Sequence, residues 1–214
     1  MIRLFNAFVK LTGLPAALLV FRTKVYYENK AAQGRRIKGA AVLVSNHTSV
    51  FDYAVYLFVF WTRTLRFQMA EVLYEKPLLA LLLRCLGGIR VNRDAHDFGF
   101  VPKSLSILSH GGVVGIFPES RLPLPGEERP LPFKVSAAYL ALTSGSKIIP
   151  VVTNGSYFCR KRARVLIGKP ILASDLLEEG ADETENLAIV SERLRERIIA
   201  LEKLLHGTET TESR

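Results

Sequence analysis

Short runs of β-branched and aromatic residues alternate with longer, helix-like segments through most of the 214-residue chain. The strand-like runs cover residues 24–28, 40–45, 65–70, 88–91, 113–118, 147–153 and 164–169. Helical patterns cover residues 49–61, 77–88, 100–112, 132–145 and 184–206. This alternation predicts an α/β fold in which helices flank a mostly parallel central sheet. Sheets of that kind bind ligands at the carboxyl ends of their strands.

The first 22 residues, MIRLFNAFVKLTGLPAALLVFR, are largely apolar. Lys10, Gly13 and Pro15 interrupt them, and the uninterrupted stretch after the proline is far shorter than the roughly 20 residues that span a bilayer. The pattern favours a helix that lies in the membrane interface, although a helix packed on the domain's own core remains an alternative. The interfacial helix would present Phe5, Phe8, Val9 and Leu18. We therefore expect a membrane-associating segment at 1–22, an α/β domain at 23–206 and a polar tail at 207–214.

Basic residues are concentrated in two segments. Residues 1–40 contain eight Lys and Arg but one acidic residue, and residues 159–169 contain five Lys and Arg and no acidic residue. Residues 174–214, in contrast, hold eleven Asp and Glu against five Lys and Arg. This asymmetry indicates a basic face that meets an anionic partner, either a phospholipid surface or nucleic acid. The two cysteines form no C-x-x-C pair, which fits a reducing cytosol.

The stretch VLVSNHTSVFDY places a histidine directly after an apparent core strand and an aspartate five residues later. On one ideal helix His47 and Asp52 would lie about 140° apart, so they can meet only if His47 precedes the helix and Asp52 lies in its first turn. Ser49 and Asp52 fit a helix-capping pattern, which is the simpler interpretation of the aspartate. A cap does not require His47 or Asn46, whereas a histidine bonded to a carboxylate has the tautomer needed for general-base catalysis. The segment therefore favours catalysis.

Further polar clusters follow other predicted strands. Arg93 lies in GGIRVNRD, and Glu119 and Arg121 lie in IFPESR. Each arginine alone is more typical of a solvated loop. Two arginines with a glutamate at the same sheet edge as the histidine favour a phosphate-binding site. Pro150 lies inside the strand-like run KIIPVVT.

Motifs of several other enzyme classes are absent from the sequence. There is no G-x-S-x-G nucleophile elbow, no H-E-x-x-H zinc motif, no Walker loop and no G-x-G-x-x-G dinucleotide motif. The remaining histidines have no metal-ligand spacing. The sequence therefore predicts neither a metal nor a cofactor.

Taken in order, these four clusters resemble the glycerolipid acyltransferase family, most closely its bacterial-type 1-acylglycerol-3-phosphate (lysophosphatidate) acyltransferases. The N-H-x-x-x-x-D block matches Asn46, His47 and Asp52, and the Gly-rich second block matches GGIRVNRD with Arg93. The third block usually reads F-P-E-G-T-R and is FPESR here, so that Ser120 replaces a Gly-Thr pair. The apolar strand with Pro150 matches the fourth block. The resemblance covers roughly residues 40–155.

The resemblance implies that His47 takes a proton from an acceptor hydroxyl, which attacks an acyl thioester of coenzyme A or acyl carrier protein, while Asp52 orients the imidazole. Arg93, Glu119, Ser120 and Arg121 would hold the head group of a lysophospholipid, with Asn46 and Pro150 nearby. The implied place of action is the cytoplasmic face of the cell membrane, as a peripheral or monotopic protein that binds no nucleic acid. Glycerol 3-phosphate or another lysolipid is an alternative acceptor. A non-catalytic basic protein that binds lipid or nucleic acid is the alternative from another class.

Overall fold

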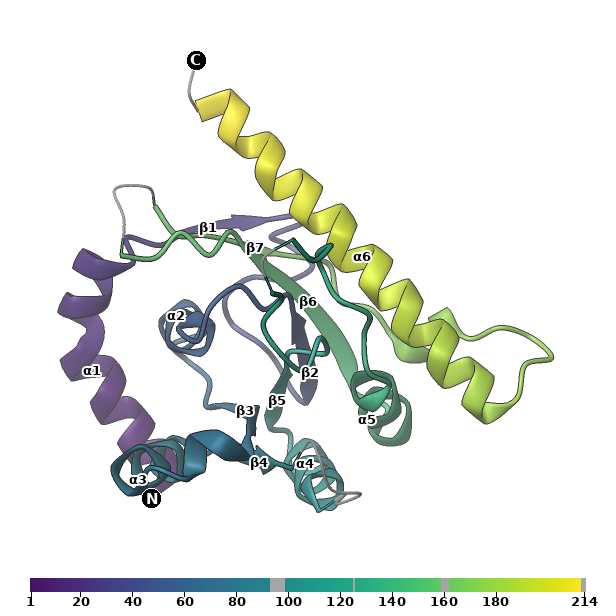
Figure 1. The fold of residues 1–214 in the computed structure, drawn as a ribbon, viewed down its shortest axis with the longest axis horizontal. Helices are drawn as coiled ribbons and strands as arrows, with labels where there is room; N and C mark the ends of the chain where they lie inside the picture. Colours follow the sequence, from purple (N-terminus) through teal and green to yellow (C-terminus); the bar gives the residue numbers. More distant parts are fainter. Residues whose placement is uncertain (93–98, 125, 159–161, 213–214) are drawn as a thin grey trace.

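A computed structural model describes residues 1–92, 99–124, 126–158 and 162–212 of the chain. Seven strands form one sheet in the order β1-β7-β6-β2-β5-β3-β4 (Figure 1). Their bounds are β1 Lys24–Tyr27, β2 Ala41–Ser45, β3 Leu65–Ala70, β4 Ile89–Val91, β5 Val113–Ile116, β6 Lys147–Thr153 and β7 Arg164–Ile167. Every strand lies within a run that the sequence predicted, because apolar β-branched residues fit a sheet that is covered on both faces.

The sheet is mostly parallel, which confirms the predicted fold class. Strands β6, β2, β5, β3 and β4 run in one direction, and β1 and β7 run in the other. The only antiparallel ladder among the described strands joins β6 to β7. The carboxyl ends of the five codirectional strands therefore share one edge, where the polar clusters were expected to meet.

Helices cover both faces of the sheet. They are α1 Ile2–Val20, α2 Asp52–Val59, α3 Pro77–Leu86, α4 Phe100–Ser109, α5 Ser136–Ser144 and α6 Glu183–Glu212, with short 3₁₀ turns at Glu71–Tyr74 and Ala173–Leu176. Side chains alternate along β2, so that Ala41 and Leu43 pack under α2 while Val42 and Val44 pack under α5 and α6. Figure 1 shows α6 on the opposite side of the sheet from α1 and α2. The result is a three-layer sandwich with one apolar core on each face.

Helix α6 is longer than the sequence predicted. Its buried stripe is the expected one and consists of Val190, Leu194, Ile198, Leu201 and Leu205. The helix continues to Glu212, so the predicted end of the helix near His206 was too early. A helix that is already anchored adds one hydrogen bond for each residue that it fixes, and polar residues suffice for this extension.

Helix α1 is continuous over 19 residues and includes Lys10, Gly13 and Pro15, which interrupt its apolar sequence but not its backbone. Gly13 permits a close approach to α2, since a Cβ there would lie 3.1 Å from Cζ of Phe58. Lys10 is also buried against the domain, with its side chain 5% exposed. By length and composition alone α1 is long and apolar enough to cross a membrane, a property it shares with core helices and signal sequences.

One face of α1 is apolar and exposed. Only 17% of its most apolar window is buried in the domain. Exposed apolar side chains on this helix are Leu4, Phe8, Leu11, Leu18, Leu19 and Val20, and those on the neighbouring α3 are Leu78, Leu81 and Leu82. Of the residues expected to face lipid, Phe8 and Leu18 are exposed, whereas Phe5 and Val9 are half-buried.

Candidate active site

His47 and Asp52 lie together at the carboxyl end of β2. His47 is on the turn that leaves the strand, and Asp52 is the first residue of α2. The His47 Nδ1 atom lies 3.0 Å from Asp52 Oδ2. The Asp52 side chain is fully buried, whereas that of His47 is 15% exposed. This is the geometry that the spacing required, with the histidine before the helix and the aspartate in its first turn.

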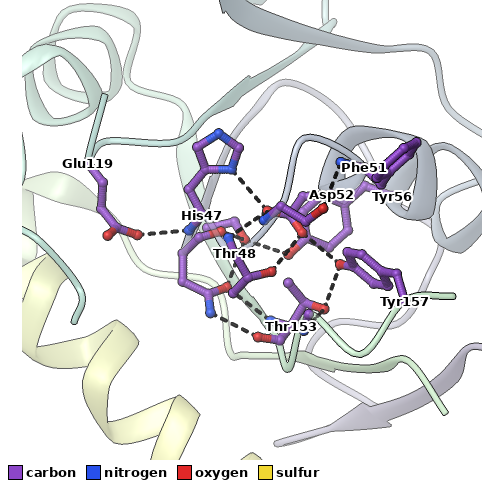
Figure 2. A network of polar contacts seen from close by, with 12 residues as sticks. His47, Thr48, Phe51, Asp52, Tyr56, Glu119, Thr153 and Tyr157 are labelled. Carbon is purple, nitrogen blue, oxygen red and sulfur yellow. Dashed lines mark hydrogen bonds and ion pairs between the residues drawn. The ribbon is translucent and has the colours of Figure 1, made fainter. Parts of the chain in front are cut away.

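The Asp52 carboxylate accepts four further hydrogen bonds, which fix its orientation (Figure 2). Oδ2 accepts the backbone N–H groups of Thr48 and Ser49 at 2.7 and 2.9 Å. Oδ1 accepts the hydroxyls of Thr48 and Tyr157 at 2.8 and 2.7 Å. With every neighbour donating to Asp52, the carboxylate is the acceptor for His47, so Nδ1 carries the proton and Nε2 is left as the acceptor.

The Asp52 carboxylate contacts both the backbone of the turn that precedes α2 and the imidazole of His47. Its carboxylate accepts the Ser49 N–H, as in a capping box, and Ser49 Oγ accepts the N–H of Phe51 at 3.2 Å. The same carboxylate contacts His47. A single buried side chain thus organises the turn between β2 and α2 and orients the imidazole.

Phe117, at the end of the neighbouring strand β5, packs flat on the imidazole. The ring centroids of His47 and Phe117 are 4.2 Å apart, and the ring planes differ by 14°. Stacking and the bond to Asp52 restrict the two side-chain torsions of His47. The ring is therefore held with Nε2 away from Asp52, before any substrate binds.

Glu119 holds the backbone of this site. Its Oε1 accepts the N–H of His47 at 2.8 Å, and Oε2 accepts the N–H of Leu131 at 2.9 Å. Burial raises the pKa of the Glu119 carboxyl, and the two backbone N–H bonds act in the opposite direction. The sequence suggested that Glu119 contacts the substrate. In the structure each of its oxygens accepts one backbone N–H, and one of these belongs to His47. Figure 2 shows Glu119 and Tyr157 on opposite sides of the His47–Asp52 pair.

Asn46 connects the ends of two strands and the C-terminal helix. Its side-chain amide exchanges hydrogen bonds with the backbone of Thr153, at 3.0 Å to the N–H and 2.9 Å to the carbonyl. It also donates to Glu202 Oε1, on α6, at 2.6 Å. Burial is the main reason that the pKa of the Glu202 carboxyl is raised. Asn46 therefore supports the turn that carries His47.

The remaining predicted site residues lie in three different situations. Arg93 falls outside the described residues. The exposed Arg121 side chain forms a bidentate pair with Glu127, with both N–O distances at 2.7 Å. Pro150 is buried within β6 and lies opposite Val44 of β2. Val44 is three residues before His47.

Ser120 adopts a positive φ of 64°. This is the left-handed region that favours glycine, so the serine occupies a backbone conformation suited to the glycine of the longer F-P-E-G-T-R pattern. The loop between Glu119 and Arg121 thus keeps the bend of a glycine-containing loop although it lacks the glycine.

Thr48, Tyr157, Thr153 and Glu202 were not identified from the sequence. Tyr157 follows β6 in the run TNGSY, and its position after a strand end was the one available signal. Glu202 is a polar residue beside the buried stripe of an amphipathic helix, a position at which most glutamates face solvent. Among the described residues, no group of three or more His, Cys, Asp or Glu side chains is arranged to hold a metal ion.

Comparisons with known proteins identify the family of the chain and a similar fold. A family model described as Acyltransferase matches residues 22–154, which include β2, the His47–Asp52 turn and Glu119. The crystal structure of the 1-acyl-sn-glycerophosphate acyltransferase PlsC from Thermotoga maritima has a similar fold, with a TM-score of 0.64 and 20% sequence identity. That match covers 92% of this chain and 79% of the other. No curated protein sequence matches the chain.

Proposed function

Because the chain belongs to the acyltransferase family, we propose that it moves a fatty acyl group from a thioester to the free hydroxyl of a lysophospholipid. The thioester is acyl-CoA or acyl carrier protein, and the acceptor is 1-acylglycerol 3-phosphate, which gives phosphatidic acid. The observation that carries the proposal is the His47–Asp52 pair, in which a fully buried carboxylate lies 3.0 Å from Nδ1. The similarity in fold to an enzyme named for 1-acyl-sn-glycerophosphate supports the choice of acceptor.

In the proposed mechanism His47 is the general base. The acceptor hydroxyl donates its proton to Nε2 as its oxygen attacks the thioester carbonyl, which forms the new C–O bond. The C–S bond breaks, and the imidazolium returns the proton to the leaving thiolate. Asp52 stabilises the imidazolium and holds the proton on Nδ1. The acceptor oxygen is itself the nucleophile, so the reaction needs no acyl-enzyme.

The phosphate of the acceptor would be bound by arginine. Arg121 is exposed, and its partner Glu127 lies on the same loop. Water screens an exposed ion pair, so a phosphate dianion can replace the Glu127 carboxylate at little cost. Arg93 is the second proposed phosphate ligand. Asn46, Glu119, Ser120 and Pro150 would then act by holding the backbone around His47 and Arg121.

The proposed site of action is the cytoplasmic face of the membrane, where the protein is peripheral or monotopic. Its exposed apolar side chains on α1 and α3 support this. Each leucine transferred from water into acyl chains contributes about 1.5–3 kcal/mol, so a few inserted side chains suffice for stable attachment.

The test is an assay of the purified protein with labelled acyl-CoA and acyl carrier protein thioesters. The acceptors are lysophosphatidate, glycerol 3-phosphate and an uncharged-headgroup lysolipid in detergent micelles. We expect phosphatidic acid from lysophosphatidate, and a loss of roughly 10²–10⁴-fold in rate for His47→Ala. A melting curve for His47→Ala establishes that the variant is folded. A folded variant that keeps more than a tenth of the rate would exclude His47 as the base, and a preference for glycerol 3-phosphate would reassign the acceptor.

A further inference from the structure

A second cleft lies at the end of the sheet opposite to His47. It has a volume of about 580 Å³ and lies between the N-terminal half of α1, the segment that precedes β3 and the segment that precedes β5. His47 follows the carboxyl end of β2, whereas these two segments lead into the amino ends of strands parallel to β2. The cleft is therefore separate from the candidate active site.

The cleft is lined by cationic side chains. Arg3 and Lys10 come from α1, Arg63 from the segment before β3, and Arg66 from β3 itself. His110, at the end of α4, is a further polar lining residue. None of its lining residues is Asp or Glu. Burial and the nearby Arg3 guanidinium both lower the pKa of the Arg63 and Arg66 guanidinium groups. Arg3 thus lies close enough to Arg63 and to Arg66 to repel each of them.

Two of the cations are held in place by the backbone. Lys10 Nζ donates to the carbonyls of Trp61 at 3.0 Å and Arg63 at 2.6 Å. The Arg63 guanidinium donates to the carbonyls of Gly39 and Gly111. These bonds are made to neutral groups, so they fix the cations without cancelling their charge. Within the described part of the chain, neither Arg3 nor Arg66 forms an ion pair with a carboxylate.

We propose that this cleft is a second binding site, which takes a phosphate group carried by a lipid head group or free in solution. A phosphate offers oxygens to several guanidinium groups at once, and its negative charge relieves the repulsion of Arg3 with Arg63 and with Arg66. The rigid placement of Arg63 and Lys10 pre-organises the site. The proposal does not depend on the chemistry assigned to His47, because it concerns the other end of the sheet.

Trp61 provides a direct reporter of this site. It is the one tryptophan in the sequence, it lines the cleft, and its side chain is 56% exposed. Full-length protein would be titrated with inorganic phosphate, and separately with sodium chloride at equal ionic strength, while Trp61 emission and the melting temperature are recorded. We expect a saturable emission change and a rise in melting temperature with phosphate that chloride does not reproduce.

The variant Arg66→Gln should weaken the apparent phosphate affinity by at least about tenfold, as loss of a charge-assisted bond does. Arg36→Gln is the matched control, because Arg36 is exposed and lies outside the cleft, and it should bind phosphate as wild type does. Arg3→Gln, at an exposed helix position, replaces Arg66→Gln if the latter does not fold. The same weakening in Arg36→Gln would reveal a general charge effect and overturn the proposal.

Vesicles distinguish the two sources of phosphate. Phosphatidylcholine vesicles with and without phosphatidic acid would be added to wild type and to Arg66→Gln. A Trp61 response that requires both phosphatidic acid and Arg66 assigns a lipid head group, and a response to inorganic phosphate alone assigns a soluble ligand. Failure of both probes to give an Arg66-dependent response would refute the site, whatever the outcome of the acyl-transfer assay.

Discussion

The two ends of the central sheet hold charges of opposite sign. At the carboxyl end of β2 three carboxylates, Asp52, Glu119 and Glu202, accept hydrogen bonds from backbone N–H groups and uncharged side chains. At the other end, Lys10 and Arg63 donate to backbone carbonyls. In both regions neutral dipoles replace water around a charge.

The difference lies in how complete this replacement is. Both oxygens of Asp52 and of Glu119 are occupied by donors from the chain itself. The opposite end gathers Arg3 and Arg66 beside the fixed cations and offers no carboxylate among the lining residues of the cleft. Where all polar groups are hydrogen-bonded within the chain, they are held in a fixed geometry before a substrate binds. Where positive charge is not balanced by carboxylates, the region attracts an anion.

The largest expected effect is that of Asp52→Asn. An amide at this position would present an NH₂ group to donors that now face carboxylate oxygens, and it would no longer hold the proton on His47 Nδ1. In an analogous triad such a change costs about 10⁴ in rate, and we expect a loss of 10³–10⁴ in kcat here. Asp175→Asn, an exposed carboxylate on a 3₁₀ turn, is the control. A folded Asp52→Asn protein with near wild-type kcat would show that the satisfied carboxylate is a structural cap only.

Tyr157→Phe should have an intermediate effect. The change removes one donor to Asp52 and a contact of 2.9 Å with the Thr153 hydroxyl. A hydrogen bond to a charged group contributes about 1.5–3 kcal/mol, so we expect kcat to fall roughly tenfold with KM unchanged. Tyr139→Phe, on α5, is the matched control. A rise in KM without a fall in kcat would place Tyr157 against the substrate instead of behind Asp52.

A Lys10 variant tests whether hydrogen bonds compensate for the burial of charge less completely in the cationic cleft than around Asp52. Burial lowers the pKa of Lys10 from 10.5 to about 8. Between these values the unfolded chain binds more protons than the folded one, so the free energy of unfolding should rise with pH through this window. Lys10→Met lacks that contribution.

We therefore expect the free energy of unfolding of wild type minus that of Lys10→Met, measured by urea denaturation, to increase from pH 7.5 to 9.5. The difference for Lys38→Met, an exposed lysine, should stay constant. If the difference for Lys10→Met is also constant with pH, the three backbone carbonyls near Nζ compensate for the burial of the ammonium group. Charge would then be compensated equally well at the two ends of the sheet.

The smallest effect is expected for Ser120, whose φ of 64° suits glycine. Ser120→Gly removes the strain but enlarges the conformational freedom of the unfolded chain, and the two terms nearly cancel. Ser120→Ala keeps a Cβ and serves as the control. We expect the glycine variant to be more stable than the alanine variant by about 0.5 kcal/mol in urea denaturation. A less stable glycine variant would mean that the loop is not strained at this position.

The fold and the His47–Asp52 pair were predictable from the sequence because both depend on local patterns. Apolar runs marked the strands, and a polar residue directly after such a run marked the end of the sheet at which the site lies. The burial of Lys10 on α1 was not predictable, since it depends on the carbonyls of Phe60 and Trp61, which follow α2.

The supporting residues of the site were missed for a related reason. Tyr157 is separated from Asp52 by 105 positions, and Glu202 from Asn46 by 156. No local pattern reports such a contact. The contacts of Glu119 also involve a residue outside its own motif, because its second oxygen accepts the N–H of Leu131 from the far side of the loop.

The bond between Asn46 and Glu202 has a consequence for biosynthesis. Translation delivers α1 first and the Glu202 carboxylate more than 150 positions after Asn46. A nascent chain can therefore present the apolar face of α1 to a bilayer before it holds the Asn46 side chain in place. The order of synthesis thus separates the formation of α1 from the formation of the Asn46–Glu202 bond, and the rate of translation sets the interval between the two events.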